Sequence, residues 1–462
     1  MNRQDFYNQC RKDYPTFTYQ GYSYNLTEDG IDAVFDFSID GLSEFHPTWH
    51  ISRIRQADYD INETMVDEMV FALGMVELVS YWKISCAPKV IINPRSLSLE
   101  QIGWWKKLYF NGLGEFYYTN GIDENFDDFM SIVCKEGATP SLSVDSDKSY
   151  AIIGDKKPAV LIPVGGGKDS VVSIELLKDK TDEYCYIINS RGATEDTVRV
   201  ANLKEKTIYA KRTLDKNMLD LNAKGFLNGH TPFSALVSFS SIIAGYLNGI
   251  SFVALSNESS ANESTVAGSY VNHQYSKSFE YESDFRAYER KFIGSGVYYF
   301  SFLRPISELQ IAMLFSRFKP YHGIFKSCNV GSKQDIWCGH CPKCLFVYTI
   351  LSPYLSIEEL DSIFNKRLFE DPELISDFDK LCGVVPEKPF ECVGSRDEVN
   401  AAVTETISKY AAMQRPLPAL LAHYQTHNVV PNIQFNKYKG LFASEHALPD
   451  YFKNILLDAI DE

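Results

Sequence analysis

The sequence predicts an α/β protein built around a doubly wound, mostly parallel sheet. From Pro158 onward, short β-branched runs alternate with helical segments, in AVLIPV, DSVVSIELL, YCYIINS, TVRVANLKEK, TIYAKR and ISFVALS. This alternation is typical of βαβ units, which place helices on both faces of a sheet. After residue 352 the chain is instead amphipathic-helical, in SIEELDSIF, EVNAAVTETISKYAAM and YFKNILLDAI. The 462 residues equal about three typical domains of ~150, and we predict units at 1–150, 151–355 and 356–462.

The first of these units is predicted to be an α+β domain. Aromatic and polar side chains alternate from residue 16 to 38 around Glu28-Asp29-Gly30, which indicates a hairpin. A helical spacing of apolar residues begins at Asn62 and breaks before Pro88, after which VII predicts a short strand. Ser98 and Gln101 have the spacing of a capping box that opens another helix. The Ser/Asp-rich stretch SLSVDSDKS then suggests a boundary near residue 150.

The charge balance limits the kinds of partner. The chain has 45 Lys and Arg against 60 Asp and Glu, a formal net charge of −15, so we expect no nucleic-acid partner. The first residues lack the apolar run of a secretory signal, and we expect a cytoplasmic protein. The uncharged stretch 227–257 is interrupted by Pro232 and Asn248-Gly249. We therefore predict a buried helix at 233–247, a turn and a buried strand, and no membrane insertion.

The strongest motif is a glycine-rich turn between the strand AVLIP and a helix. It reads Val164-Gly165-Gly166-Gly167-Lys168-Asp169-Ser170. Consecutive glycines allow positive φ and bring backbone N–H groups close to an anion, and the helix N-terminus adds its positive dipole end. Lys168 and Ser170 can add a charge and a hydroxyl. The spacing is neither that of a Walker A loop nor GxGxxG, and the plain alternative is a flexible glycine turn.

Four of the ten cysteines cluster late in the chain. Cys328 is followed by Cys338, Cys341 and Cys344, the last three in a Cys-x₂-Cys-x₂-Cys pattern. Four thiolates at this spacing match a tetrahedral structural Zn²⁺ site, with unligated loop cysteines as the alternative. With four cysteines available, we expect His340 to be a solvated turn residue.

A polar segment follows the predicted strand ISFVALS, at the sheet edge where parallel sheets bind ligands. It contains Asn257, Glu258, Asn262 and Glu263, side chains that can hold Mg²⁺ or ribose, or transfer a proton. A polar loop that caps a helix would look the same. Among the histidines, His230 precedes the buried helix directly and is the better functional candidate; His273 and His322 have ordinary core or solvent explanations.

Gly165 to Ser170 resembles the PP-loop (SGGxDS) of the N-type ATP pyrophosphatases, which split ATP to AMP and diphosphate while they adenylate a substrate oxygen. The resemblance implies that Gly166, Gly167 and Ser170 hold diphosphate and that Asp169 orders the loop or meets Mg²⁺. It also implies that Asn189, Ser190 and Arg191, with Gly192, line the adenosine side. Gly165 stands where that superfamily usually has Ser, so one hydroxyl–phosphate bond is in doubt. A similar late four-cysteine site occurs in the PP-loop enzymes that make 7-cyano-7-deazaguanine, where it is structural.

A wider set of segments resembles the MurL family of UDP-N-acetylmuramoyl-L-alanyl-L-glutamate epimerases. These segments are LGMVELVSYWK, VGGGKDSVVSIELL, NSRG, GHTPFSALVSF, LSNESSANEST, VNHQYSKS, CGHCPKC and KPFECVG. The resemblance implies an ATP- and Mg²⁺-dependent isomerase of peptidoglycan precursor synthesis. It would convert the terminal L-Glu of UDP-MurNAc-L-Ala-L-Glu to D-Glu through an acyl-adenylate and release AMP and diphosphate.

This chemistry assigns expected roles to the residues. The catalytic candidates are Lys168, Asp169, His230, Glu258 and Glu263. The substrate candidates are Asn257, Asn262 and His273, together with Trp82 and Lys83, which we expect, beside Trp104, Trp105 and Lys106, to grip the UDP part on the N-terminal unit. Plain core packing is the alternative for the tryptophans, and the segment Lys388 to Arg396 is a second place for UDP.

Two other kinds of function remain open from the sequence. The chain could be another PP-loop adenylating enzyme, one that amidates, forms a nitrile or thiolates tRNA, although the net charge of −15 argues against tRNA. It could also be a non-enzymatic zinc-knuckle binding protein with a degenerate loop, which the intact Asp169 and Ser170 argue against.

Overall fold

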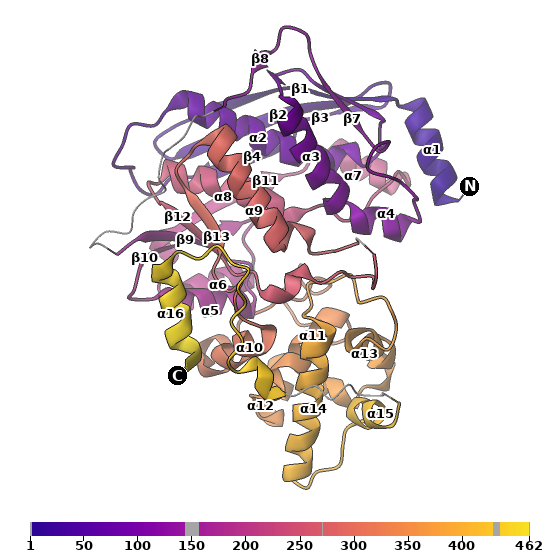
Figure 1. The fold of residues 1–462 in the computed structure, drawn as a ribbon, viewed down its shortest axis with the longest axis vertical. Coiled ribbons are helices and arrows are strands. Elements are labelled where there is room, and N and C mark those ends of the chain that lie inside the picture. Colours follow the sequence, from indigo (N-terminus) through magenta and orange to yellow (C-terminus); the bar gives the residue numbers. More distant parts are fainter. Residues whose placement is uncertain (1, 144–156, 270, 428–434, 462) are drawn as a thin grey trace.

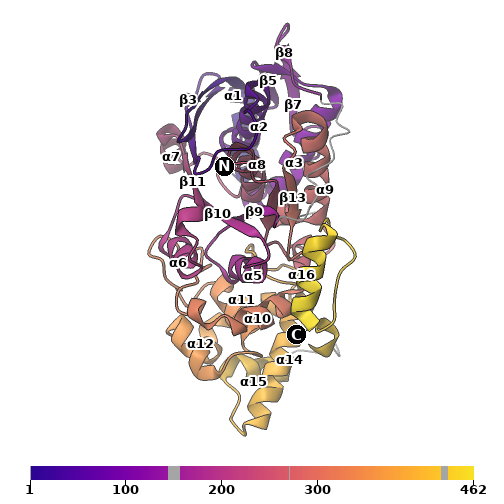
Figure 2. The same ribbon diagram turned by 90° about the vertical axis from the view of Figure 1, so that its left-hand side faces the viewer.

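The computed structural model describes residues 2–143, 157–269, 271–427 and 435–461. The boundary predicted near residue 150 lies outside these ranges. Within them, eleven strands form one mixed, mostly parallel sheet with helices on both of its faces (Figures 1 and 2). The predicted α/β class is confirmed. None of the helices described has the length and apolar character needed to cross a membrane.

The parallel part of the sheet carries the glycine-rich turn of residues 164–170, which we call the phosphate loop. Its strands run in the order β13, β12, β9, β10, β11, and every neighbouring pair is parallel. The bounds are β9 Ala159–Pro163, β10 Asp182–Ile188, β11 Thr207–Thr213, β12 Phe252–Leu255 and β13 Tyr298–Ser301. Strands β10 and β11 therefore follow β9 on one side of it, and β12 and β13 lie on the other side. The carboxyl end of β9 is a topological switch point, where such sheets bind ligands.

The N-terminal strands continue this sheet. They follow β11 in the order β4, β2, β1, β5, β7, with β3 beside β2. Their bounds are β1 Thr16–Leu26, β2 Gly30–Ile39, β3 Ser43–Phe45, β4 Thr48–Ser52, β5 Lys89–Ile92 and β7 Ser131–Cys134; β6 Arg95–Ser96 pairs separately with β8 Thr139–Pro140. The antiparallel pairing of β4 with β11 joins the two parts. Apart from the small β6–β8 pair, the strands of residues 2–143 thus belong to the same sheet as the parallel strands, and the three-unit division stays a prediction.

Local sequence signals set the ends of several elements as predicted. The hairpin is β1 and β2, and the helix that begins after Asn62 is α2, Glu63–Trp82, with the Asn62 side chain as its cap. Ser98 and Gln101 form the expected capping box of α3, Leu99–Gly112. The buried helix is α8, Phe233–Leu247, and Gly249 takes a φ of +63° in the turn before β12.

The helices cover the two faces and fill the C-terminal part. One face of the sheet carries α2, α3, α8 and α9, and the other carries α5, α10 and α11, each with its own apolar core. The bounds are α1 Arg3–Asp13, α4 Gly114–Asn120, α5 Lys168–Leu177, α6 Gly192–Val200, α7 Lys216–Ala223, α9 Phe279–Tyr288, α10 Glu308–Arg317, α11 Pro342–Leu351, α12 Ile357–Phe364, α13 Ile375–Cys382, α14 Arg396–Ala412, α15 Ala419–His427 and α16 Asp450–Asp461. The predicted helical C-terminal segment is seen in orange to yellow in Figure 1, and α16 returns to pack on α5.

Candidate active site

A cavity of about 300 Å³ lies at the carboxyl end of β9, where the topology predicts a ligand. Three stretches of chain form its wall: the phosphate loop after β9, the start of α6 after β10, and the residues that follow β12. The remaining lining comes from Ser234 and Val237 of α8, from Lys277, from residues between 326 and 335, from Lys343 and from Cys392. Sequence segments up to about 230 residues apart therefore meet at one crevice.

The phosphate loop has the conformation that its glycines allow. Gly166 has a φ of +82°, and a Cβ there would lie 2.9 Å from Ala193 Cβ, at the start of α6. Gly167 caps α5, so the N–H groups of that helix are directed toward the cavity end of β9. The Lys326 N–H donates to the Gly166 carbonyl at 2.8 Å, and the Ser170 hydroxyl donates to the Gly167 carbonyl at 3.1 Å. The loop is thus held by one hydrogen bond from a neighbouring segment and by one between its own residues.

Four basic side chains converge on this cavity: Arg191, Lys277, Lys326 and Lys343. In a chain of net charge −15, such a concentration of cations in one crevice favours the binding of an anion. Asp169 and Asp335 are the acidic residues among the lining. A di- or triphosphate has the charge to satisfy the four cations, and the glycine loop supplies N–H donors for its oxygens.

Lys168 does not line the cavity. Its ammonium is buried in ion pairs with Asp169 and with Glu308, at the start of α10. Burial would lower the pKa of Lys168, but the two carboxylates outweigh it and raise that pKa; Lys168 in turn lowers the pKa of Asp169 against the effect of burial. The expectation that Lys168 adds its charge directly to a bound phosphate is therefore not met in this structure, because the carboxylates neutralise it. The ion pair with Lys168 instead holds the Asp169 carboxylate in place beside the cavity.

A thiol, two imidazoles and a carboxylate form a second cluster that reaches the cavity through Cys392. The Cys392 Sγ lies 3.8 Å from His273 Nε2, and His273 Nδ1 hydrogen-bonds to the Glu115 carboxylate. His230 Nδ1 is 3.3 Å from the same carboxylate, and its ring centroid is 4.5 Å from that of His273. The predicted residues His230 and His273 are thus brought together, on a carboxylate from α4 that the sequence did not indicate.

The charges in this cluster are strongly perturbed. Burial opposes ionisation of Cys392, yet Lys277 and the hydrogen bond from His273 lower its pKa to about 5. Burial likewise disfavours the charged form of His273, but its bonds to Cys392 and Glu115 raise its pKa to about 10. Burial, with the neighbouring His273, lowers the pKa of His230 to about 4. At neutral pH the cluster therefore holds a thiolate, an imidazolium and a neutral imidazole.

The polar segment after β12 is divided between different surroundings. Asn257 lines the cavity and donates to Ser301 Oγ at 3.1 Å. Asn262 lies at a second cavity of about 630 Å³, lined mainly by amide and hydroxyl side chains. Glu258 is buried outside the cavity lining. Glu263 is held in ion pairs with Lys388 and Arg396, which gives it a structural role and leaves its acid–base role a prediction.

Of the residues Asn189, Ser190 and Arg191, which were expected to contact adenosine, Arg191 alone is among the cavity lining. Arg191 lines the cavity just before α6. Asn189, with a φ of +51°, exchanges hydrogen bonds with the backbone of Arg212 on β11, and neither Asn189 nor Ser190 is part of the cavity lining. Asn189 therefore shapes the turn that presents Arg191.

The aromatic residues expected to grip UDP belong to the core. Trp82 and Trp105 are fully buried, and the Trp82 ring nitrogen donates to the Ala87 carbonyl at 2.8 Å. Trp104 packs among aromatic side chains, with its ring centroid 4.4 Å from that of Tyr288, and its ring nitrogen donates to the Asp284 carbonyl. Lys83 is also buried, and its ammonium donates to the Gly229 carbonyl. A buried ring has no free face for uracil, so the structure corrects the role expected of Trp82 to core packing.

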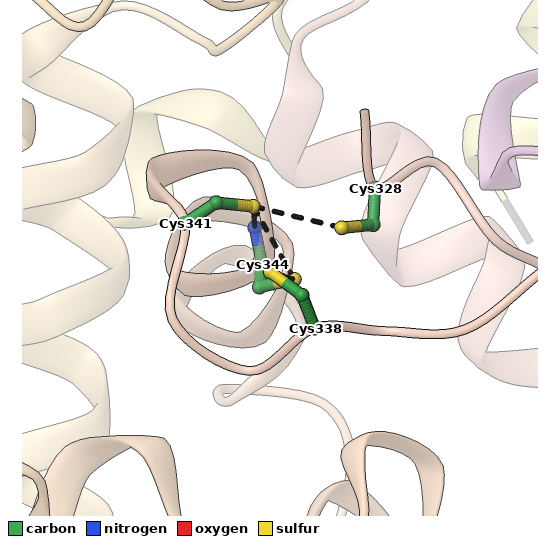
Figure 3. Close-up of side chains that lie close together, drawn as sticks. All are labelled: Cys328, Cys338, Cys341 and Cys344. Carbon is green, nitrogen blue, oxygen red and sulfur yellow. Dashed lines mark hydrogen bonds between the residues drawn. The ribbon is translucent and has the colours of Figure 1, made fainter. Parts of the chain in front are cut away.

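The four clustered cysteines converge as a zinc site requires (Figure 3). Their Sγ atoms all lie within 4.8 Å of one another, with the pairs 328–341 and 338–344 at 3.7 Å and the pair 341–344 at 3.5 Å. A tetrahedron with Zn–S distances of ~2.3 Å has S–S edges of about 3.8 Å, far from the ~2.05 Å of a disulfide. The Gly331 N–H also donates to Cys328 Sγ at 3.1 Å. The thiols therefore fit Zn²⁺ held by Cys328, Cys338, Cys341 and Cys344.

Comparison with known proteins places the chain in a family. Residues 8–302 match the MurL N-terminal domain and residues 324–430 match the MurL C-terminal domain. The chain belongs to the MurL family. Family relatives named UDP-N-acetyl-alpha-D-muramoyl-L-alanyl-L-glutamate epimerase come from Salinispora tropica, Xanthomonas oryzae pv. oryzae and Micromonospora sp..

These relatives are each 32% identical to the chain. The matches cover 84%, 75% and 84% of the chain and 84%, 76% and 86% of the relatives, in the same order. No solved structure shows a significant match. The family matches therefore span both the sheet and the cysteine cluster. The cavity lining up to Lys277 lies in the first match, and the lining from Lys326 onward lies in the second.

Several cavity residues were missed as individuals although their segments were noted. Lys277 lies in VNHQYSKS, Lys343 lies between Cys341 and Cys344, and Cys392 lies in KPFECVG. The signal available was the resemblance, because all three segments were noted for their likeness to the MurL family. Glu115 offered no comparable signal, because it reads as an ordinary acidic residue in the first turn of a helix.

Proposed function

We propose that this protein is an ATP-dependent epimerase that converts the terminal L-Glu of UDP-MurNAc-L-Ala-L-Glu to D-Glu. The observation that carries the proposal is the cavity at the β9 switch point, where a glycine loop and four cations lie beside a paired thiol and imidazole. The first group suits nucleotide phosphates and the second suits proton transfer. The names of the family relatives point to the same reaction, and they do not favour thiolation, nitrile formation or a scaffold role.

Adenylation explains why an epimerase has a nucleotide site. The α-proton of a glutamyl residue is very weakly acidic while the adjacent carboxylate is ionised, because the carbanion would lie beside a negative charge. An acyl-adenylate removes that charge and lets the electron pair of the C–H bond move onto the acyl oxygen. After proton return on the opposite face, water releases AMP.

The chain's own residues have distinct tasks in this proposal. Gly166, Gly167 and Ser170 hold the diphosphate leaving group in the manner of a PP-loop, the superfamily to which we assign the domain. Arg191 and Lys277 neutralise the phosphates and the developing oxyanion. Asp169, one of the two lining carboxylates, would meet Mg²⁺, since hard cations prefer carboxylate oxygen. At about 300 Å³ the cavity is at the small end of ligand pockets, so we assign to it the reacting groups and not the whole UDP-linked substrate.

The remainder of the substrate needs a second surface. Asn257 lies in the first cavity and Asn262 in the second, five residues along the same segment. The second cavity presents Asn111, Asn272 and Tyr275 beside serine hydroxyls, donors and acceptors that suit a sugar and a peptide. We place the muramoyl-alanyl part there, and the cytoplasmic location expected from the sequence remains a prediction.

Zn²⁺ would have a structural task. Bound by four thiolates it has no open position, and it would fix the segment that carries Lys326 and Ser327 and the helix start that carries Lys343. Both of these segments line the cavity.

The test of the function is an isotope experiment. The protein is incubated with ATP, Mg²⁺ and UDP-MurNAc-L-Ala-L-Glu in D₂O, and we expect deuterium at the glutamate Cα, D-Glu in the product, and AMP with diphosphate. A matched pair of variants locates the site: Ser170→Ala and Ser316→Ala each remove a hydroxyl that donates to the carbonyl three residues earlier. Only Ser170 lines the cavity, so Ser170→Ala alone should slow diphosphate release. A protein that releases diphosphate without α-deuteration, or that does neither, contradicts the proposal.

A further inference from the structure

The thiol, imidazole and carboxylate of Cys392, His273 and Glu115 form a connected chain that ends in the nucleotide cavity. Glu115 accepts from His273 Nδ1, and His273 Nε2 lies 3.8 Å from Cys392 Sγ. Cys392 is part of the cavity lining with Gly167 and Asp169. A thiol placed in this order is poised as a base or nucleophile, because the carboxylate holds the imidazole and the imidazolium holds the thiolate.

The backbone around Cys392 is fixed from two sides. The Lys343 ammonium donates to the Cys392 carbonyl, and the Gln274 amide donates to the Val393 carbonyl at 3.1 Å. Gln274 directly follows His273 in the chain. The hydrogen bond from Gln274 to Val393 therefore also sets the position of the Cys392 thiol relative to the His273 imidazole. Such double anchoring is expected of a reacting group, which must hold its position to within a fraction of an ångström.

We propose that Cys392 Sγ is the base that removes the α-proton of the adenylated L-glutamyl residue, with His273 and Glu115 as positioning residues that keep it ionised. This assignment rests on the proposed epimerase function. The α C–H bond breaks, an S–H bond forms at Cys392, and the electron pair moves onto the acyl oxygen. A solvent proton then adds to the opposite face of Cα, and the Cys392 thiol returns its proton to solvent.

The charges that face Cys392 agree with this role. Lys277 and Lys343 supply two positive charges, His273 supplies a third, and Glu391 is the adjacent acidic group. These cations outweigh burial and bring the Cys392 pKa to about 5. Lys277 is also influenced by Asp169, on the phosphate loop. The ammonium is therefore placed where it can stabilise both the thiolate and the oxygen that receives the electron pair.

Other candidates for the base are less well placed. Glu263 is held by Lys388 and Arg396, and Glu258 is buried outside the cavity lining. His230 is neutral at physiological pH, but it touches Glu115 and is not among the cavity-lining residues. The two carboxylates of the lining have other partners: Asp169 is ion-paired with Lys168, and Asp335 accepts from the Ala193 N–H at 2.9 Å. Cys392 is the group of the lining that is paired with an imidazole.

The experiment compares Cys392→Ser with Cys134→Ser, a half-buried cysteine on β7. For each protein, α-deuteration of UDP-MurNAc-L-Ala-L-Glu in D₂O is divided by the rate of ATP–diphosphate exchange. We expect this ratio to fall at least about 100-fold for Cys392→Ser, the usual contribution of a general base, and to stay at the wild-type value for Cys134→Ser. A smaller fall overturns the assignment. A wild type without α-deuteration instead overturns the epimerase function itself.

A second measurement needs no variant that might misfold. Zinc-loaded wild type is treated with iodoacetamide at pH 6.5, and modified cysteines are quantified by mass spectrometry. Cys392 should react, while Cys10, whose pKa burial raises to about 11, should not; loss of α-deuteration should follow the modified fraction. Unmodified Cys392, or full modification with deuteration retained, overturns the proposal, as does an acyl group trapped on Cys392, which would make it a nucleophile. Glu115→Gln should move the pH midpoint of alkylation upward by about one unit, and an unmoved midpoint overturns its positioning role.

Discussion

Two neighbouring glycines of the phosphate loop should respond differently to the same added methyl group. Gly166 has a φ of +82°, and a Cβ there would lie 2.9 Å from Ala193 Cβ. Gly165 is not among the glycines with positive φ, and a Cβ there would meet no atom of the described chain within 4 Å. Gly166→Ala should therefore strain the loop, and Gly165→Ala should leave it unchanged.

The size of the effect follows from these two numbers. A left-handed conformation costs alanine about 1–2 kcal/mol. Ordinary carbon–carbon contacts lie at ~3.5–4.0 Å, and forcing a closer contact in a packed region costs about 1–3 kcal/mol. We expect Gly166→Ala to lose about 2–4 kcal/mol of unfolding free energy if the loop keeps its shape. If the loop shifts instead, the same free energy is lost from ATP binding, at about 1.4 kcal/mol per tenfold.

Urea denaturation with and without ATP, together with calorimetric titration of ATP, measures both quantities in the same samples. Gly165→Ala should stay within about 0.5 kcal/mol of the wild type in stability, as surface substitutions usually do. Equal unfolding free energies and equal ATP affinities for the two alanine variants would refute the reasoning, because the loop would then not depend on the backbone conformation of Gly166.

Three further predictions concern the metal, the core and the pH. Cys344→Ser should lower zinc content, folded yield and ATP affinity together, measured by elemental analysis and titration; a preparation with normal zinc would contradict this. Trp82→Phe should lower the denaturation midpoint without changing affinity for UDP-MurNAc-L-Ala-L-Glu, since the ring is buried. Folded Cys392 and His273 have pKa values of about 5 and about 10, against ordinary values of 9.0 and 6.5. The folded pair thus holds one proton between these limits, whereas the unfolded pair holds two below pH 6.5 and none above pH 9. Stability relative to the variant Cys392→Ala/His273→Gln should rise from pH 5 to 6.5, stay level to 9 and fall toward 10.

Local sequence patterns were enough to predict where helices such as α8 and α3 begin or end, and to predict the phosphate loop. Pro232 and Asn248-Gly249 bracket α8 because each disfavours continuation of a helix, and the Ser98 and Gln101 pair caps α3 through contacts three residues apart. The glycine loop was recognisable because its strand, turn and helix are contiguous. The cysteine cluster followed from spacing, since three of its four members lie within seven residues.

Long-range pairing was not predictable in this way. The pairing of β4 with β11 joins residues about 160 positions apart, and no local signal specifies which strand edges meet. Glu115, His273 and Cys392 are separated by more than 100 residues at each step. The tryptophans were assigned to ligand binding for a related reason: sequence shows that an aromatic side chain is present, but only packing shows whether its face is covered, as it is for Trp82.

The cysteine cluster and the cavity at the carboxyl end of β9 form one structural unit. Lys326 and Ser327 directly precede Cys328, and the Lys326 N–H donates to the Gly166 carbonyl in the phosphate loop. Lys343 lies between Cys341 and Cys344, lines the cavity, and donates to the Cys392 carbonyl. A metal bound by the four thiols would therefore fix the phosphate loop through one ligand segment and Cys392 through another. Because one contact is made by the Lys326 N–H and the other by the Lys343 ammonium, the position of Cys392 relative to the phosphate loop depends on how rigidly the cysteine cluster is held.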